Sequence, residues 1–203
     1  MPPTNPARRR ALTDAAIALL ASSGVHGLTH RAVEKEADLP PGTASNYFRD
    51  RETLLVAAAE RVVELHHTDT DRATDQATEP TERPATLDDL LTESLLTAAT
   101  TLRDRYLAIF ELQLESVRRP ALASALAGLG DAAVRITAGQ HDKLGLTLPR
   151  ETIPALIALY GGALFTLVTA PPETVDRNVV QTLVRTILNG CASQEENPEA
   201  TRI

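Results

Sequence analysis

Residues 28–55 decide the fold, and they read LTHRAVEKEADLPPGTASNYFRDRETLL. Thr29 suits the N-cap of a helix, and Val33 and Ala37 lie four residues apart, on one face of that helix. The Asp38-Leu39-Pro40 sequence should end it, because proline cannot continue a helix. The first part of this stretch therefore predicts a short helix followed by a tight polar turn.

The second part of the stretch predicts two more helices. Pro41 suits the first turn of a helix, whose inward side would carry Ala44, Tyr47 and Phe48. Asp50 is a predicted cap of the next helix, whose apolar stripe is Leu54, Ala58, Val62 and Leu65. Together these signals favour a helix-turn-helix followed by a connecting helix.

A helix-turn-helix presents one short helix to the major groove of DNA, with small and hydroxylated residues free to approach the backbone and the bases. Residues of this kind in the second helix are Gly42, Thr43, Ser45 and Asn46. A helical corner inside an ordinary bundle is the alternative that composition leaves open.

The order of these residues resembles the DNA-binding domain of the TetR (TetR/AcrR) family of bacterial transcriptional regulators. The matching positions are Leu28, Thr29, Arg31, Val33, Ala37, Gly42, Thr43, Tyr47, Phe48 and Leu55, with Arg51 where the family usually has Lys. The chain departs from the family pattern at Asp38, which replaces a turn glycine, and at Pro40-Pro41. It also departs at Ser45, where a phosphate-binding tyrosine is common.

The resemblance implies an all-α fold of about nine helices. An N-terminal three-helix helix-turn-helix DNA-binding domain would precede a C-terminal helical ligand-binding and dimerisation domain. We expect residues 1–67 to form the first domain with its connecting helix, and residues 68–203 to form the second. Residues 70–84 are rich in Thr, Asp, Glu and Pro, which predicts a frayed helix end and a loop.

Composition supports helices and excludes several classes of function. The chain of 203 residues is 43% hydrophobic but only 3% aromatic, so its core must be Leu, Ala and Val, which favours packed helices over a sheet. Its one cysteine, Cys191, excludes an internal disulfide. The sequence contains no convergent acid, base and nucleophile and no Gly-rich phosphate loop, so we predict a protein that is not an enzyme and needs no cofactor.

A metal site is the alternative suggested by one polar cluster. Its members are His66, His67, Asp69 and Asp71. Because His67 and Asp71 are four residues apart, they would share a helix face, but no third ligand of matching spacing completes a cage. We interpret the cluster as a solvated helix end and expect no metal.

The net charge of -7 is divided unevenly along the chain. Residues 1–51 carry seven basic and five acidic residues, a net charge of +2, which leaves -9 for the remainder. A basic front on an acidic body keeps phosphate contacts at one end. No apolar stretch is long enough to span a bilayer, and the N-terminus lacks a signal-peptide core, so we expect a cytoplasmic protein with no membrane partner.

A first helix is predicted from Asn5-Pro6 to Gly24. Its inward face would carry Leu12, Ala16, Leu19 and Ser23. Arg8, Arg9 and Arg10 lie at its start, where cations oppose the helix dipole, so phosphate attraction explains them better than helix stability. A solvated arm is the alternative for these arginines.

Arg31 is the best candidate to read a guanine, because its planar fork matches the O6 and N7 acceptors, and the family resemblance points to the same position. Arg51 is expected to bind a phosphate from the start of the connecting helix. The full set that we expect at double-stranded DNA is Arg8, Arg9, Arg10, Thr29, His30, Arg31, Gly42, Thr43, Ser45, Asn46, Tyr47 and Arg51.

Capping, proline and glycine signals predict the remaining helices. Thr86 to Asp89 is a capping signature that opens one helix, and another is expected over 102–117. Further helices are predicted from Arg119-Pro120 toward residue 143 and over 173–189, with Gly190 as the stop of the last one.

Residues 153–170, IPALIALYGGALFTLVTA, should form a helix that is apolar around its circumference and needs cover on several sides. With the final helix it predicts a homodimer through a four-helix bundle, which the TetR resemblance also implies. The expected interface residues are Leu159, Gly162, Ala163, Val179, Leu183 and Ile187. Burial inside one chain is the alternative.

A dimer would place two recognition helices about 34–36 Å apart, as a palindromic operator requires. A small-molecule effector in the C-terminal domain could change that separation. The candidate effector-binding residues are Tyr106, Phe110, Gln113, His141, Tyr160, Phe165 and Thr166. The shortage of aromatic residues favours an aliphatic or small polar-headed effector over a flat aromatic cation.

The family resemblance implies a repressor that its effector releases from DNA. The alternative is a DNA-binding regulator without a small-molecule effector, controlled by a protein partner or by its own abundance. A pocket in the second domain would favour the first interpretation.

Overall fold

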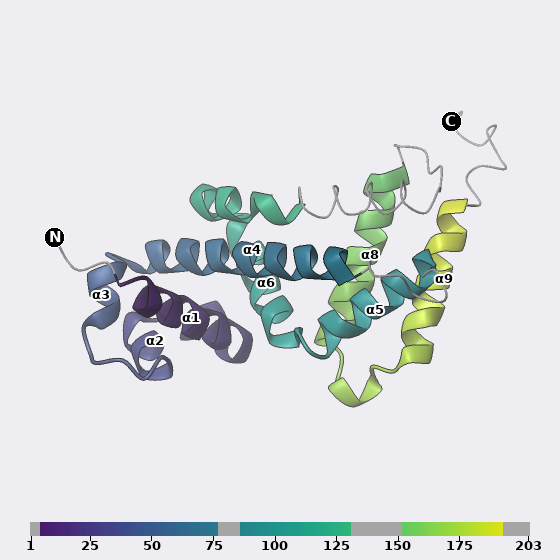
Figure 1. The fold of residues 1–203 in the computed structure, drawn as a ribbon. Coiled ribbons are helices and arrows are strands. Elements are labelled where there is room, and N and C mark those ends of the chain that lie inside the picture. Colours follow the sequence, from purple (N-terminus) through teal and green to yellow (C-terminus); the bar gives the residue numbers. More distant parts are fainter. Residues whose placement is uncertain (1–4, 77–85, 131–151, 193–203) are drawn as a thin grey trace. The chain divides into compact units, whose positions relative to one another are not determined.

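The computed structural model describes residues 5–76, 86–130 and 152–192, and within these ranges every regular element is a helix (Figure 1). The helices are α1 (Pro6–Gly27), α2 (His30–Glu36), α3 (Thr43–Tyr47), α4 (Arg51–Gln76), α5 (Leu87–Ala99), α6 (Arg103–Ser116), α8 (Thr152–Thr169) and α9 (Arg177–Ala192), with a short 3-10 helix at Pro172–Thr174. Residues 120–130 are also helical. The predicted all-α class is confirmed.

The chain divides into two compact units. The first unit comprises Met1–Pro80 and Asp104–Gly130, and the second unit comprises Thr81–Arg103 and Asp131–Ile203. The predicted domain boundary after residue 67 falls inside α4, which continues to Gln76. Of the segment 70–84, predicted as a frayed helix end and a loop, residues 70–76 form the last part of α4, and residues 77–84 lie outside the described residues.

The start of α1 follows its local sequence signals. The Asn5 side-chain oxygen accepts hydrogen bonds from the backbone N–H groups of Ala7 (3.0 Å) and Arg8 (3.3 Å). Pro6 takes the first helical position, where its missing N–H costs nothing. The predicted cap is thus confirmed, and the face that α1 buries carries Leu12, Ala15, Ala16, Ile17 and Leu20.

The end of α1 differs from the prediction. Gly24 has a φ of 63°, a left-handed conformation that favours glycine, and one more helical turn follows it up to Gly27. The predicted end at Gly24 is therefore a kink. Ser23, predicted to face inward, is exposed.

Local capping also sets α2 and the turn that follows it. The Thr29 hydroxyl oxygen accepts a hydrogen bond from the N–H of Ala32 (3.1 Å), which confirms it as the N-cap. Asp38 has a φ of 52° and occupies the left-handed region, where residues other than glycine are uncommon. This is the position at which the family pattern has its turn glycine.

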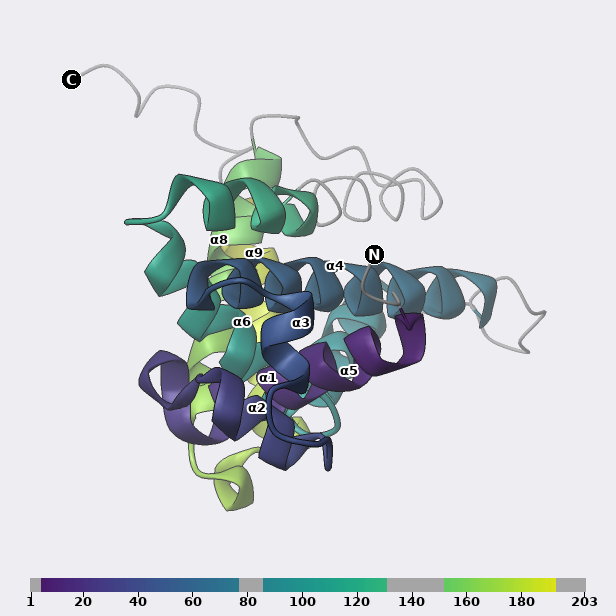
Figure 2. The same cartoon turned by 90° about the vertical axis from the view of Figure 1, so that its left-hand side faces the viewer.

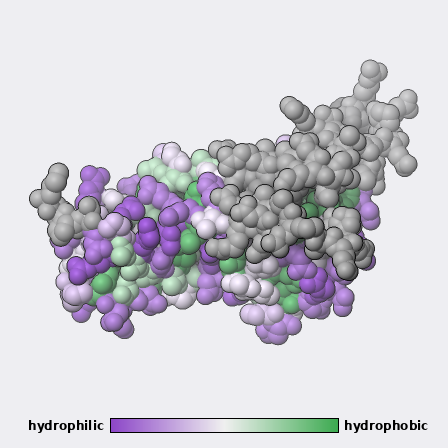
Figure 3. Space-filling view, viewed as in Figure 1, coloured by the Kyte–Doolittle hydropathy of each residue, from purple (hydrophilic) through white to green (hydrophobic). Residues whose placement is uncertain are grey.

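The core of the first unit joins residues that are far apart in sequence. Figures 1 and 2 show α1, α2 and α3 gathered near the end at which α4 begins. Their core also takes side chains from α6 and from residues 120–130, namely Ala108, Ile109, Leu112, Leu122 and Leu126. The face of this unit seen in Figure 3 is mainly hydrophilic, with smaller hydrophobic areas.

The second unit packs α5, α8 and α9 on one another. The predicted capping signature is confirmed, because Thr86 and Asp89 form a reciprocal capping box at the start of α5. The shared core consists of Leu87, Leu95, Ala98, Ala99, Leu156, Ala163, Leu164, Leu167, Val168, Val180, Val184 and Ile187. Gly190 does not stop α9, which continues to Ala192.

Candidate nucleic-acid interface

The outer side of α3 forms the candidate reading surface. Gly42 is the N-cap of α3 and has a φ of 86°, so the helix begins at Thr43. The prediction that Pro41 lies in its first turn is wrong. Ser45 and Asn46 are exposed on the following turn. A short hydroxyl and amide surface of this kind is able to approach base edges and phosphates in a groove.

The inner side of α3 holds the helix on the first unit. Ala44 and Phe48 are 0% and 1% exposed. Tyr47 is half-buried, and its hydroxyl oxygen accepts a hydrogen bond from the backbone N–H of Asn5 (3.3 Å). Tyr47, predicted to contact DNA, therefore joins the end of α3 to the start of α1.

The start of α2 lies beside this surface. Arg31 is exposed and forms no hydrogen bond or ion pair with another described residue, so its guanidinium remains open to a base or phosphate. Thr29 is exposed but its hydroxyl caps α2. His30 has its Nε2 atom 2.8 Å from the Phe48 carbonyl oxygen, and a ring N–H there ties α2 to the end of α3.

Arg51 has internal partners that the sequence does not indicate. Its Nε donates a hydrogen bond to the Leu28 carbonyl oxygen (3.0 Å), and its Nη2 donates to the Val25 carbonyl oxygen. These carbonyls belong to the kinked end of α1 and the corner before α2. The sequence predicted Arg51 as a phosphate contact. In the structure its guanidinium instead joins α4 to the α1–α2 corner through these two hydrogen bonds.

The three N-terminal arginines are exposed, but they differ in their partners. Arg9 pairs with Glu60 at 3.3 Å, and its guanidinium carbon lies 5.8 Å from the centroid of the Phe48 ring. Arg8 and Arg10 form no ion pair with another described residue. They are therefore better placed than Arg9 to meet a phosphate.

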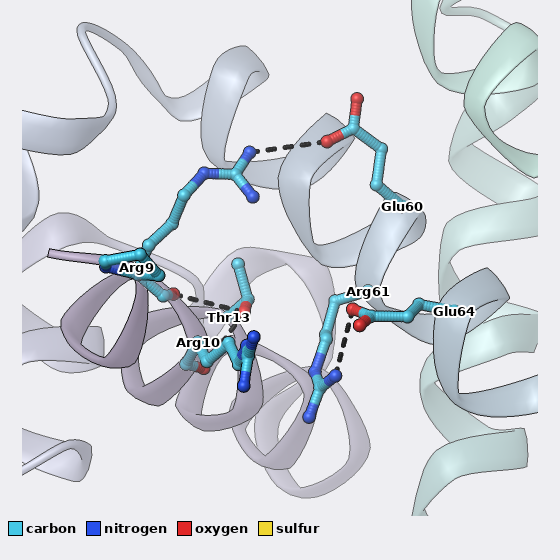
Figure 4. Close-up of a pocket in the computed structure, with 7 residues that line it drawn as sticks. Arg9, Arg10, Thr13, Glu60, Arg61 and Glu64 are labelled. Carbon is cyan, nitrogen blue, oxygen red and sulfur yellow. Dashed lines mark hydrogen bonds and ion pairs between the residues drawn. The ribbon is translucent and has the colours of Figure 1, made fainter. Parts of the chain in front are cut away.

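A shallow pocket of about 160 Å³ lies between α1 and α4 (Figure 4). Its lining consists of Pro6, Arg9, Arg10, Thr13, Glu60, Arg61 and Glu64. Arg61 is held there by Asp14 (2.7 Å) and Glu64 (2.9 Å). Ion pairs in and beside this pocket join α1 to α4. Because its cations and carboxylates neutralise one another, the pocket does not offer a single sign of charge to a ligand.

Asp50 fixes the entry to α4 directly after α3. Its Oδ1 accepts hydrogen bonds from the backbone N–H (2.8 Å) and the hydroxyl (2.7 Å) of Thr53, so the predicted cap is confirmed. These bonds, with the backbone N–H of Thr53 contributing most, hold the pKa of Asp50 below its usual value. The carboxylate thus stays ionised beside the candidate interface.

Two carboxylates of the first unit escaped the sequence analysis. Glu34 is 5% exposed, and its Oε1 accepts a hydrogen bond from the N–H of Ala44 (2.7 Å). Glu111, from α6, accepts a hydrogen bond from the N–H of Val25 through its Oε2 (3.0 Å). Charged residues are mostly exposed, so the sequence predicts an exposed Glu34. Its burial is seen only in the structure.

The predicted effector-binding residues fall in both units. Tyr106, Phe110 and Gln113 belong to α6 in the first unit, where Gln113 is exposed and burial raises the pKa of Tyr106. Tyr160, Phe165 and Thr166 belong to α8 in the second unit. The Tyr160 hydroxyl lies 2.7 Å from that of Ser94 on α5. His141 lies outside the described residues.

The outer face of α8 is apolar. Exposed positions recur at helical spacing along Ala155, Ala158, Leu159, Gly162, Phe165 and Thr166, with Leu159 and Phe165 each 49% exposed. Phe165 and Thr166 therefore share the face of Leu159 and Gly162, which were predicted for the dimer.

The remaining predicted dimer residues divide between the surface and the core. Val179 of α9 is 43% exposed, and Leu183 is half-buried. Ala163 and Ile187 are only 9% and 8% exposed, because they pack inside the second unit. The prediction that these two side chains lie in an interface between chains does not fit their position.

The polar cluster of α4 was predicted to lie at a helix end. It does not, because α4 continues beyond it to Gln76. Desolvation by burial, followed by the charges of His67 and Arg105, lowers the pKa of His66. Asp69 pairs with Arg105 of α6, and the Nε2 of His67 lies 3.4 Å from the Gly128 carbonyl oxygen. Within the described parts of the chain, no three His, Cys, Asp or Glu residues are grouped to hold a metal ion.

The helices of the described ranges include none that is both long and apolar enough to cross a membrane. The first unit, with its helix-turn-helix and the exposed candidate reading surface on α3, has the architecture of a helix-turn-helix DNA-binding domain. Residues 12–58 match the profile "Bacterial regulatory proteins, tetR family", and residues 82–190 match "Tetracyclin repressor-like, C-terminal domain". The chain belongs to the TetR family and is a DNA-binding transcriptional regulator, not an enzyme.

Individual relatives support the same family. The HTH-type transcriptional regulator BetI of Rhizobium meliloti (strain 1021) is 32% identical over 82 residues, which is 40% of this chain and 40% of BetI. A TetR-family structure from Streptomyces coelicolor A3 is 28% identical, with a TM-score of 0.66, over 89% of this chain and 97% of that one. The multidrug binding protein EbrR in complex with ethidium is 28% identical, with a TM-score of 0.65, over 90% and 99%.

Proposed function

We propose that this regulator is a homodimer that represses transcription from a palindromic operator and is released by a small-molecule effector. The observation that carries the proposal is the reading surface of Ser45 and Asn46 on α3, with the open guanidinium of Arg31 beside it. Repression is proposed by analogy, because residues 82–190 match the model "Tetracyclin repressor-like, C-terminal domain". Because it acts on the chromosome, we place the protein in the cytoplasm.

Dimerisation is supported by the apolar outer face of α8. Leu159 and Phe165 are each half exposed there, and an exposed apolar stripe along a helix is a common site of association. A two-fold pair of chains would bring two reading surfaces to successive major grooves, about 34–36 Å apart. The palindromic operator follows from that symmetry.

The effector is proposed by similarity and by composition. EbrR is a multidrug binding protein in complex with ethidium in one structure and with proflavin in another. The present chain has only three Tyr, three Phe and no Trp, so we propose an aliphatic or small polar-headed effector in place of a flat dye. The candidate residues for its site are Tyr106, Phe110 and Gln113 of the first unit, and Tyr160, Phe165 and Thr166 of the second unit.

Binding of the purified chain to the DNA flanking its own coding region tests the proposal. We expect specific binding that weakens steeply with salt, with a scrambled duplex of equal length bound far more weakly. Sedimentation of the complex should give two chains per site or a multiple of two. Equal affinity for both duplexes would contradict an operator at that locus.

The same assay separates the two modes of control. Release of the DNA by aliphatic carboxylates or amines, with ethidium as the flat aromatic comparison, would support an effector of the proposed class. If neither class of compound releases the DNA, control by a protein partner or by abundance becomes the better explanation.

Arg31→Ala tests whether the reading surface is assigned correctly. We expect a loss of about 1–3 kcal/mol in binding to the specific site and a relaxed preference at one base pair. Arg118→Ala is the matched control, because Arg118, in the turn that follows α6, is also exposed, at 69% of its side chain, and its substitution removes the same charge. An equal loss of affinity on every sequence would make Arg31 a phosphate contact.

A further inference from the structure

A buried carboxylate lies directly behind the recognition helix. Glu34 belongs to α2 and is 5% exposed, although charged residues are seldom buried without a partner. Its Oε1 accepts a hydrogen bond from the backbone N–H of Ala44, at 2.7 Å. This bond crosses from the first helix of the helix-turn-helix to the second.

The N–H group of Ala44 needs such a partner. The first N–H groups of a helix have no carbonyl within the helix, and side chains or water must satisfy them. The N-cap of α3 is Gly42, which has no side chain to accept a hydrogen bond. Glu34 therefore takes the part of a cap from outside, and its negative charge lies at the positive end of the helix dipole.

α3 depends on contacts of this kind because it is short. It has five residues, and a helix of that length is not stable alone, since isolated helices below about 12–15 residues are marginal in water. Only Ala44 is buried within it. The tilt and depth of α3 are consequently set by few contacts, and the hydrogen bond from the Ala44 N–H to the Glu34 carboxylate is one of them.

The neighbours of Ala44 are the residues proposed to face DNA. Thr43 and Ser45 flank it directly, and Asn46 follows. Glu34 is too deeply buried to touch DNA itself. A shift of α3 would, however, move all three of these side chains together relative to a base pair.

We propose that Glu34 is a positioning residue for DNA reading, which fixes the first turn of α3 through the N–H of Ala44 and so sets the discrimination between the operator and other DNA. This inference rests on the proposed function of the α3 surface. It assigns sequence specificity in part to a residue that makes no contact with a base. A buried carboxylate near phosphates also opposes DNA of any sequence, so its role is selectivity and not affinity in general.

Glu34→Ala and Glu34→Gln in the full chain test this role by fluorescence anisotropy. The two duplexes are the specific site from the flanking DNA and its scrambled counterpart. Glu34→Ala removes the acceptor, and we expect specific affinity to fall about tenfold or more while affinity for the scrambled duplex stays within about twofold. Glu34→Gln keeps an oxygen acceptor of the same shape, so it should recover part of the discrimination.

Glu36→Gln is the matched control. Glu36 lies in the same helix and is exposed, so its substitution removes the same charge near DNA without touching α3. We expect it to change binding to both duplexes equally. A loss of discrimination in Glu36→Gln as large as that in Glu34→Ala would overturn the positioning role.

Folding and function are separated by two further measurements. Urea unfolding shows whether each variant is folded, and hydrogen exchange of the Ala44 amide should be faster in Glu34→Ala than in the wild type. If Glu34→Ala does not fold, Glu34→Gln decides the question: a partial loss of discrimination supports the positioning role, and discrimination equal to that of the wild type overturns it. Retained discrimination in a folded Glu34→Ala overturns this inference alone, whereas wild-type protein that binds both duplexes equally overturns the proposed function with it.

Discussion

The region around α3 and the outer face of α8 use apolar residues in opposite ways. Around α3, Leu28, Val33 and Phe48 are at most 1% exposed, and polar side chains hold backbone groups in place. On α8, Leu159 and Phe165 are each 49% exposed. The apolar residues around α3 are buried by the rest of the same chain. An exposed apolar face like that of α8 is typical of a surface that a second chain covers.

The largest effect is expected in the core that α6 shares with α1 and α4. Leu112 is 0% exposed there, and Leu114 on the same helix is 63% exposed. We expect Leu112→Ala to cost about 2–5 kcal/mol of unfolding free energy, because it leaves a cavity, and Leu114→Ala to cost no more than about 0.5 kcal/mol. Urea unfolding measures both free energies. Equal costs for the two substitutions would contradict the burial of Leu112 in this core.

The α8 face gives the next largest effect. Leu159→Ala should weaken self-association by about 1.5–3 kcal/mol, the value of burying one leucine, without unfolding the chain. Sedimentation over a range of concentrations measures this effect. Leu156→Ala, at a position 2% exposed on the same helix, should instead lower the unfolding free energy. If Leu159→Ala leaves self-association unchanged, the interface lies elsewhere.

Arg51 tests whether a basic residue beside the reading surface serves the fold or the DNA. Arg51→Ala removes two hydrogen bonds to carbonyl oxygens, and we expect a loss of about 1.5–3 kcal/mol in unfolding free energy with an unchanged salt dependence of DNA binding. Arg49→Ala is the control, since the side chain of Arg49 is 87% exposed. A smaller salt slope and full stability in Arg51→Ala would restore the phosphate contact predicted from the sequence.

The smallest effect is expected at the turn between α2 and α3. Asp38 has a φ of 52°, so Asp38→Gly should stabilise the chain by about 0.5–1 kcal/mol through relief of backbone strain. Asp38→Ala should destabilise it, because alanine tolerates this conformation less well than aspartate. Thermal unfolding compares the two variants, and a stabilising Asp38→Ala would show that φ is not the cause.

Local signals predicted the parts of the fold that depend on local chemistry. Thr29, Asp50 and Thr86 each cap a helix as expected, because a cap needs only the next three residues. The proline at position 41 misled the prediction of the start of α3, since the left-handed conformation of Gly42 has the stronger effect on where a helix begins.

Contacts between distant residues could not be predicted in the same way. Glu111 and Val25 are separated by 86 positions, and Arg51 and Val25 by 26, so no spacing in the sequence relates them. The apolar run of α8 posed a different problem. Because nearly every residue in it is apolar, periodicity could not distinguish buried Ala163 from exposed Gly162.

The shared core of α1, α4 and α6 has a consequence for protein engineering. Chimeric regulators are made by joining the DNA-binding part of one protein to the sensor part of another. A cut after residue 67 would remove Ala108, Ile109, Leu112, Leu122 and Leu126 from the core of the first unit and leave its apolar flank open to solvent. A transplantable DNA-binding cassette from this chain must therefore carry residues 104–130 with it, or be given a sensor whose own helices fill the same space.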